Sequence, residues 1–132
     1  MFAGTPWSDL TKMGDTQFTN ADIDDVLVTS DGLVGACARL DAGTHDLKHP
    51  LVSPVYGDFS GFPPTILVSG PRDLLLSDTV RVHRKLRQAG VEALLHVFEG
   101  LLHAQYLRLF QAPESRDAFG EVSSFFDDHL GK

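Results

Sequence analysis

The chain has 132 residues, 42% hydrophobic and 22% charged, with a formal net charge of -7. These proportions are those of an ordinary globular domain, and the length predicts one domain at most. The acidic balance argues against nucleic acid as a partner, which needs positive charge, and no apolar run reaches the roughly 20 residues that span a bilayer.

The first part of the chain, residues 1–64, is predicted to be a loop and helical segment. Its first 20 residues are rich in Gly, Thr, Asp and Asn and are interpreted as loop. A short helix is predicted over 21–28. A second helix is expected from Ser30 to the stop at Gly43, with an apolar face made of Leu33, Cys37 and Leu40.

Cys37 is the only cysteine, so an intrachain disulfide is excluded and a cysteine-based zinc site is disfavoured. Its alanine-rich surroundings favour a small core residue over a reactive thiol. The N-terminal residues lack the charge-then-apolar layout of a secretory signal. We therefore expect a cytoplasmic protein.

The second part, residues 65–132, is predicted to form a βαβ unit followed by a C-terminal helix. The run "TILVSG" is continuously apolar up to Gly70, as in a strand covered on both faces. A helix capped by Ser77 is expected next, and then a strand "VEALLHVFEG" that ends at Gly100. The pattern predicts an α/β fold class.

Two more helices are expected after this unit. A short one is predicted in "AQYLRLF", and a long one over 113–130, capped by Ser115. The long helix has a wide apolar stripe, which comprises Phe119, Val122, Phe125, Phe126, His129 and Leu130.

Two side chains with chemical potential follow the two predicted strands. Asp73 comes three residues after Gly70, and His103 three residues after Gly100. Parallel strands end at the same edge of a sheet, where the sites of α/β proteins gather, so a carboxylate and an imidazole are expected to meet there. Such an aspartate orients the ring and leaves its other nitrogen as a general base. The alternatives, a turn aspartate and a structural histidine, stay open on spacing alone.

The motifs "PWSDLT", "PLVSP", "GFPPTILVSG", "RDLLLSD", "LRQAGV" and "FEGLLHAQY" occur in this order. Together they resemble the C-terminal part of the hormone-sensitive-lipase-like esterases, a branch of the α/β-hydrolases. The resemblance implies that Asp73 is the triad acid and His103 the triad base. It gives Asp78 a supporting place, although an acidic residue in the first turn of a helix has a simpler explanation in the helix dipole. The sequence departs from the family pattern at Pro71 and at the two leucines before His103.

The family's nucleophile is the part that this sequence lacks. None of the nine serines lies in a G-x-S-x-G elbow, and no HGGG-type loop is present. Ser69 and Ser77 are poor substitutes, because neither is expected on a strand-to-helix elbow. The chain is thus interpreted as a single partial α/β-hydrolase domain over 1–132. Trp7 is a candidate for an acyl pocket, with a packing role as its alternative.

Two functions are weighed. The first is a carboxylic-ester hydrolase that acts on a small ester, completed by a serine-bearing N-terminal half, with no cofactor and no metal. His45 and His49 are interpreted as solvated loop residues. The second is a non-catalytic hydrolase remnant or interaction module. In either case we expect a homo-oligomer, because two strands alone would leave an open sheet edge.

Overall fold

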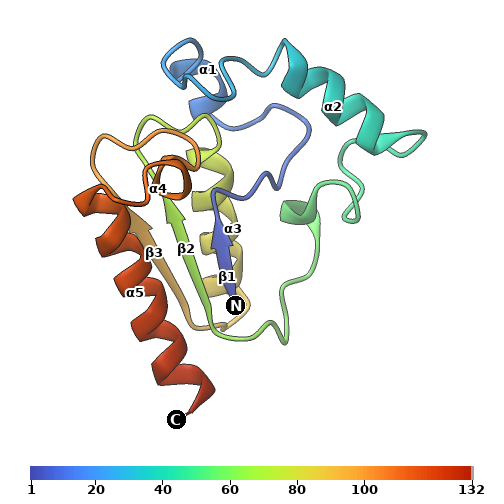
Figure 1. Cartoon of the computed structure of the whole chain (residues 1–132). Coiled ribbons are helices and arrows are strands. Elements are labelled where there is room, and N and C mark those ends of the chain that lie inside the picture. The colour runs from blue at the N-terminus through green and yellow to red at the C-terminus, as the bar shows by residue number, and fades with distance from the viewer. Residues whose placement is uncertain (132) are drawn as a thin grey trace.

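A computed structural model describes residues 1–131 as a small parallel sheet with helices on both faces (Figure 1). The sheet has three strands in the order β1-β2-β3, and both pairings are parallel. The elements in chain order are β1 (Phe2–Gly4), α1 (Thr16–Thr19), α2 (Leu33–Ala42), a 3-10 turn (Pro54–Tyr56), β2 (Thr65–Ser69), α3 (Leu76–Gln88), β3 (Ala93–Val97), α4 (Gln105–Arg108) and α5 (Pro113–Leu130).

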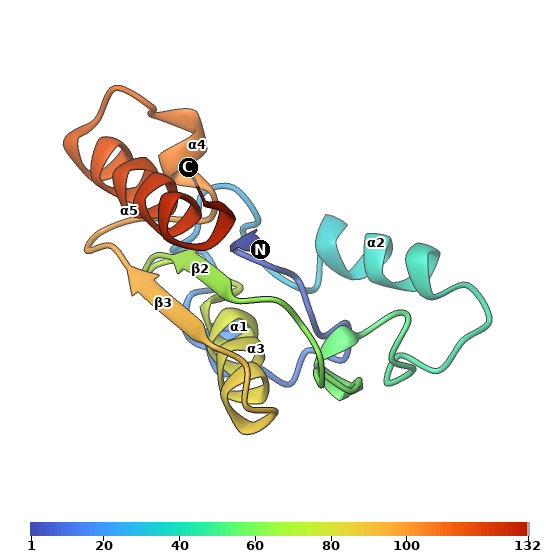
Figure 2. The ribbon, with the colours of Figure 1, turned by 90° about the horizontal axis from the view of Figure 1, so that it is seen from below.

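The central strand, β2, separates two layers of core. Successive side chains of a strand point to opposite faces, so Ile66 and Val68 face one way and Leu67 the other. The first pair packs with Tyr106 and with residues of α5, whereas Leu67 packs with Val82 and other residues of α3. Figure 2 shows α5 and α3 on opposite sides of β2. All five residues of β2 are buried, as the continuous apolar run predicts.

The βαβ unit was predicted with nearly its observed bounds, but the starts of its helices were not. Ser77 lies inside α3, which begins at Leu76, and its hydroxyl instead accepts a hydrogen bond from the Thr16 N–H at 3.0 Å. Ser115 lies in the first turn of α5, not at its cap, because Pro113 begins that helix.

The prediction for the first 20 residues was wrong. Phe2–Gly4 forms β1, which pairs with β2 in the register Phe2↔Ile66, and Thr16–Thr19 forms α1. The chain therefore covers one edge of β2 with its own strand. The physical reason for the error is length: three residues carry no alternation from which a strand is recognised.

The helix predicted over 21–28 was also wrong, because this stretch is a series of turns. Asp24 accepts the backbone N–H groups of Val26 and Leu27, at 2.9 and 3.3 Å, in place of a helical pattern. Val28 follows with a φ of 59°, in the left-handed region.

Helix α2 forms as predicted but buries the other side. Leu33 and Leu40 are 79% and 84% exposed, and Cys37 is exposed too, whereas the buried face comprises Val34, Ala38 and Ala42. Two apolar faces, offset by about one residue, satisfy the helical period in this segment, and the period does not choose between them. The prediction of Cys37 as a core residue was therefore wrong.

Candidate active site

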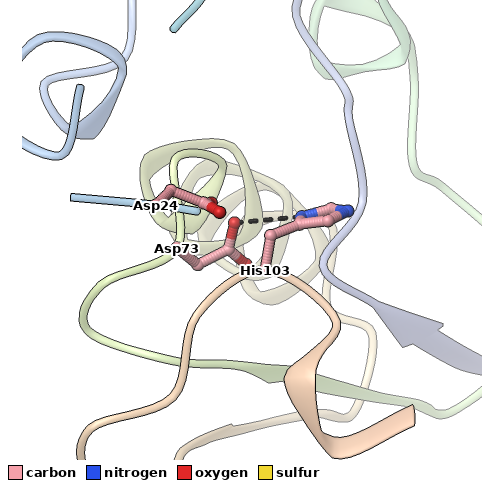
Figure 3. A group of neighbouring side chains, drawn as sticks. All are labelled: Asp24, Asp73 and His103. Atoms are coloured by element: carbon pink, nitrogen blue, oxygen red, sulfur yellow. Dashed lines mark hydrogen bonds and ion pairs between the residues drawn. The ribbon is translucent and has the colours of Figure 1, made fainter. Parts of the chain in front are cut away.

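Asp73 and His103 lie in contact beyond the carboxyl ends of β2 and β3. The distance between Nδ1 of His103 and Oδ1 of Asp73 is 3.1 Å (Figure 3). Asp73 is fully buried, and the His103 side chain is 18% exposed. An ionised carboxylate only accepts hydrogen bonds, so Nδ1 is the protonated nitrogen and Nε2 is left with its lone pair.

The Asp73 carboxylate is held by more than the imidazole. Its Oδ2 accepts from the Ser69 hydroxyl at 2.8 Å, and its Oδ1 also accepts from the Leu75 N–H at 2.8 Å. Ser69 is thus occupied as a donor to the acid, which adds a physical reason to the sequence argument against it as a nucleophile. The three hydrogen bonds fix the plane of the carboxylate that faces the ring.

A close approach of two backbones brings the loops together. A Cβ built on Gly70 would lie 2.1 Å from the carbonyl oxygen of Leu101, so only glycine fits there. The same oxygen accepts a hydrogen bond from the Arg72 N–H at 3.2 Å. The loop that follows β2 and the loop that follows β3 are therefore joined by main-chain atoms next to the Asp73–His103 pair.

The imidazole lines an apolar pocket of about 470 Å³. Trp7 and Leu75 line it as well, together with Leu33 and Cys37 from the exposed side of α2. The pocket accounts for the apolar side chains that α2 leaves unburied. It also places Trp7 where a bound acyl chain would lie beside His103.

Asp24, which sequence reasoning missed, lies next to the pair. It is 1% exposed, and its Oδ2 accepts from the Leu74 N–H at 2.8 Å. Figure 3 shows its carboxylate beside that of Asp73. No signal in the sequence separates Asp24 from its neighbours Asp22 and Asp25, apart from the turn-forming contact with the residues that follow it.

Asp24, Asp73 and His103 offer possible metal-ligand atoms that lie within 4.8 Å of one another. All four carboxylate oxygens, however, already accept hydrogen bonds from N–H or O–H groups of the chain. A carboxylate surrounded by donors is arranged to remain an anion beside an imidazole, so this chemistry favours a proton-handling group over a cation site.

Asp78, the predicted supporting residue, lies away from the pair. It is fully buried in α3, and its Oδ2 accepts from the N–H groups of Ser8 and Asp9, both at 2.9 Å. Burial raises the pKa of the Asp78 carboxyl above its ordinary value of 3.8, although these donors act in the opposite direction. Its observed contacts fasten residues 8–9 to α3.

Tyr106 reports on the surroundings of the pair. Its hydroxyl is buried and has no hydrogen-bond partner among residues 1–131. Burial, together with the negative charge of Asp73, raises the pKa of Tyr106 to about 12. The phenol therefore stays neutral, and Asp73 is the nearby group that orients the imidazole.

A parallel sheet between helices, with an acid and an imidazole at its strand ends, defines the α/β-hydrolase class. The family model described as the alpha/beta hydrolase fold matches residues 2–107, and the chain belongs to this family. The predicted fold class and the predicted relation to hormone-sensitive-lipase-like esterases are confirmed.

Solved structures agree with this assignment. The chain is similar to the esterase E25, with a TM-score of 0.95 and 54% identity over 97% of this chain and 39% of that one. It is also similar to an esterase from the bacterial hormone-sensitive lipase family, with a TM-score of 0.91 and 28% identity over 98% of this chain and 43% of that one.

An acetyl-hydrolase of Streptomyces hygroscopicus is 29% identical over 97% of this chain and 42% of the relative. An esterase of Acinetobacter venetianus is 32% identical over 58% of this chain and 25% of the relative. The chain thus spans about two fifths, or less, of the length of these relatives. Among residues 1–131 there is no helix both long and apolar enough to cross a bilayer.

Proposed function

We propose that this chain supplies the acid and the base of a serine-type carboxylic-ester hydrolase. The observation that supports it most directly is the hydrogen bond of 3.1 Å between His103 Nδ1 and Asp73 Oδ1, at the wall of an apolar pocket. An oriented imidazole with a free Nε2 is the general base that such a reaction needs. Residues 1–132 then form one part of the hydrolase domain.

The serine and the oxyanion donors come from polypeptide outside this chain. The serine oxygen forms a bond to the ester carbonyl carbon while its proton passes to Nε2 of His103. The ester C–O bond then breaks, and His103 returns that proton to the leaving alkoxide. Water repeats the two steps on the acyl-enzyme, which releases the carboxylic acid and restores the serine. Asp73 stabilises the imidazolium that forms in each step.

The substrate proposed is an ester with a short or medium acyl chain. The pocket beside His103 is about 470 Å³ and is lined mainly by apolar side chains, which suit such a chain. The names of the similar proteins, acetyl-hydrolase and esterase, support the same class. The compartment proposed is the cytoplasm, because the single cysteine forms no intrachain disulfide.

A fused protein tests the proposal. The portion of the esterase E25 that this chain does not match is placed ahead of Met1, and hydrolysis of p-nitrophenyl butyrate is measured. The fusion is expected to hydrolyse the ester and to be blocked by a serine-directed phosphonate. His103→Ala is expected to lower kcat by about 10³-fold or more, because triad members act as a unit.

His45→Ala is the matched control, since His45 is exposed in a loop. It is expected to leave kcat unchanged. Equal rates for His103→Ala and His45→Ala would refute the assignment of the base. A fusion that folds, reacts with the phosphonate and still hydrolyses no ester would refute the proposed class of reaction.

Self-association of the chain is the second candidate, as an interaction module. Among residues 1–131, β1 lies at one edge of the sheet, with its outer backbone groups facing no other strand. Such an edge accepts another strand, for example from a second copy. Light scattering on the isolated chain at micromolar concentration decides: a mass of two or more chains supports this candidate, and the mass of one chain with cooperative unfolding contradicts it.

A further inference from the structure

The loop that contains Asp73 is held from outside by the turns of residues 20–28. The amide nitrogen of Asn20 donates to the carbonyl oxygens of Pro71 and Asp73, both at 2.9 Å. Oδ2 of Asp24 accepts from the Leu74 N–H at 2.8 Å. The peptide groups on both sides of Asp73 are thus bound by side chains from a distant part of the sequence.

Asp24 is itself a fixed anchor. Its other oxygen, Oδ1, accepts from the N–H groups of Val26 and Leu27 at 2.9 and 3.3 Å. The carboxylate is 1% exposed, so no rearranged solvent shell would replace these bonds. A buried group that bridges its own turn to the peptide after Asp73 transmits the position of that turn to the acid.

We propose that Asp24 is a positioning residue for the Asp73–His103 pair. By holding the peptide between Asp73 and Leu74, it sets the direction in which the Asp73 carboxylate meets the imidazole, and so the tautomer of His103. Its effect on turnover rests on the proposed function, whereas its effect on the tautomer does not.

Asp24→Asn is the sharpest variant, because it keeps the size of the side chain. Each carboxylate oxygen of Asp24 accepts at least one backbone N–H, and asparagine has only one oxygen. Its NH₂ group must face either the Leu74 N–H or the N–H groups of residues 26 and 27, donor against donor. The variant therefore releases one side of the bridge.

Long-range ¹H–¹⁵N NMR of the chain, labelled at histidine, measures the tautomer of His103. Above the pH at which the ring is neutral, the wild type is expected to show a protonated Nδ1 and an unprotonated Nε2. Asp73→Asn gives the spectrum of a ring without its acid. Asp24→Asn is expected to shift both nitrogens at least halfway toward that spectrum.

Asp22→Asn is the matched control, because it makes the same change of charge two residues away at an exposed position. It is expected to keep the wild-type spectrum. A folded Asp24→Asn variant with the wild-type nitrogen shifts would overturn the proposal.

A measurement on the wild type keeps the proposal testable if Asp24→Asn does not fold. A coupling through the hydrogen bond is expected between the Leu74 amide nitrogen and the Asp24 carboxyl carbon, together with slow hydrogen exchange of that amide. A rapidly exchanging Leu74 amide without the coupling would overturn the proposal.

Turnover of the fused protein is the second readout. Asp24→Asn is expected to lower kcat by about 10- to 100-fold with little change in KM, as small displacements of catalytic groups do. An unchanged kcat would overturn the role of Asp24 even if the fusion is an active esterase. An inactive wild-type fusion would instead refute the proposed function, and the NMR result would still decide for or against Asp24.

Discussion

Two groups of side chains in this molecule have almost the same composition and different surroundings. The strand-end cluster comprises Asp24, Asp73 and His103, and the helix cluster comprises Asp9, Asp78 and Arg81. Each contains two buried carboxylates and one basic side chain. In the strand-end cluster the base is an imidazole at the wall of an apolar pocket, whereas in the helix cluster it is a guanidinium on α3.

The helix cluster is built to stay ionised. Burial acts to raise the pKa of Asp9, but hydrogen bonds from Thr11 and from Arg81 outweigh it and hold that pKa below its ordinary value. The Arg81 guanidinium does not lose its proton in water, and its pKa is raised further beside Asp9. These groups fasten the N-terminal segment to α3.

The comparison shows that burial of two acids beside a base does not define a function. What distinguishes the strand-end cluster is a base that exchanges its proton near neutral pH and that faces a cavity.

The largest expected effect separates the two clusters by activity. Asp73→Asn in the fused protein is expected to lower kcat by about 10³- to 10⁴-fold, because an amide no longer enforces the tautomer of His103. Asp9→Asn, the same change in the helix cluster, is expected to keep kcat within about threefold. Initial rates well below the unfolding temperature measure both. Similar losses for the two variants would erase the distinction.

A smaller effect is expected on stability. Asp78→Ala removes the acceptor of two buried backbone N–H groups, which costs about 2–4 kcal/mol of the free energy of unfolding. Urea denaturation of the chain measures it, with Asp127→Ala on the exposed side of α5 as the control. A difference between the two below about 0.5 kcal/mol would contradict the fastening role of Asp78.

Asp78→Asn is expected to be much milder than Asp78→Ala. Its oxygen accepts the same two N–H groups, and its NH₂ faces Gln17, which now donates to Asp78 at 3.2 Å. Gln17 accepts from Ser30 on its other side, so a flip of the Gln17 amide reverses both bonds and satisfies every group. The neutral variant therefore isolates the effect of charge.

The smallest effect is the pH dependence that this charge produces. Burial raises the pKa of Asp78 above 3.8, so the native state binds this proton more tightly than the unfolded state does. Ionised Asp78 thus destabilises the fold only above pH 3.8, and increasingly so up to its raised pKa. The free energy of unfolding of the wild type, minus that of Asp78→Asn, is expected to fall over this window and then to level off.

The slope of that difference cannot exceed about 1.4 kcal/mol per pH unit for one proton. Urea denaturation at a series of pH values, starting just below the ordinary pKa of aspartate, measures it. A difference that rises with pH would mean that the hydrogen bonds to Asp78 outweigh its burial.

The βαβ unit could be predicted from sequence because its signals are local. A continuous apolar run ends at Gly70, a second apolar segment ends at Gly100, and the residues three positions later are an acid and a histidine. Parallel topology then brings both loops to one edge. The contact between Asp73 and His103 follows from these facts without knowledge of any other residue.

The N-terminal part resisted prediction because its structure depends on distant partners. Residues 2–4 form a strand only by pairing with β2, more than sixty residues away in sequence. Asp24 is one of three aspartates within four residues, and only the position of the Leu74 N–H distinguishes it. The two possible faces of α2 were likewise decided by what surrounds the helix.

Gly70 has a consequence for how far this sequence can vary. The gap between the loops after β2 and β3 is set by main-chain atoms, because Gly70 touches the Leu101 carbonyl oxygen directly. Side chains at the neighbouring positions do not determine that gap. Pro71 and the two leucines before His103, which depart from the family pattern, are therefore compatible with an unchanged distance between acid and base, and substitution of glycine itself is the change that would drive them apart.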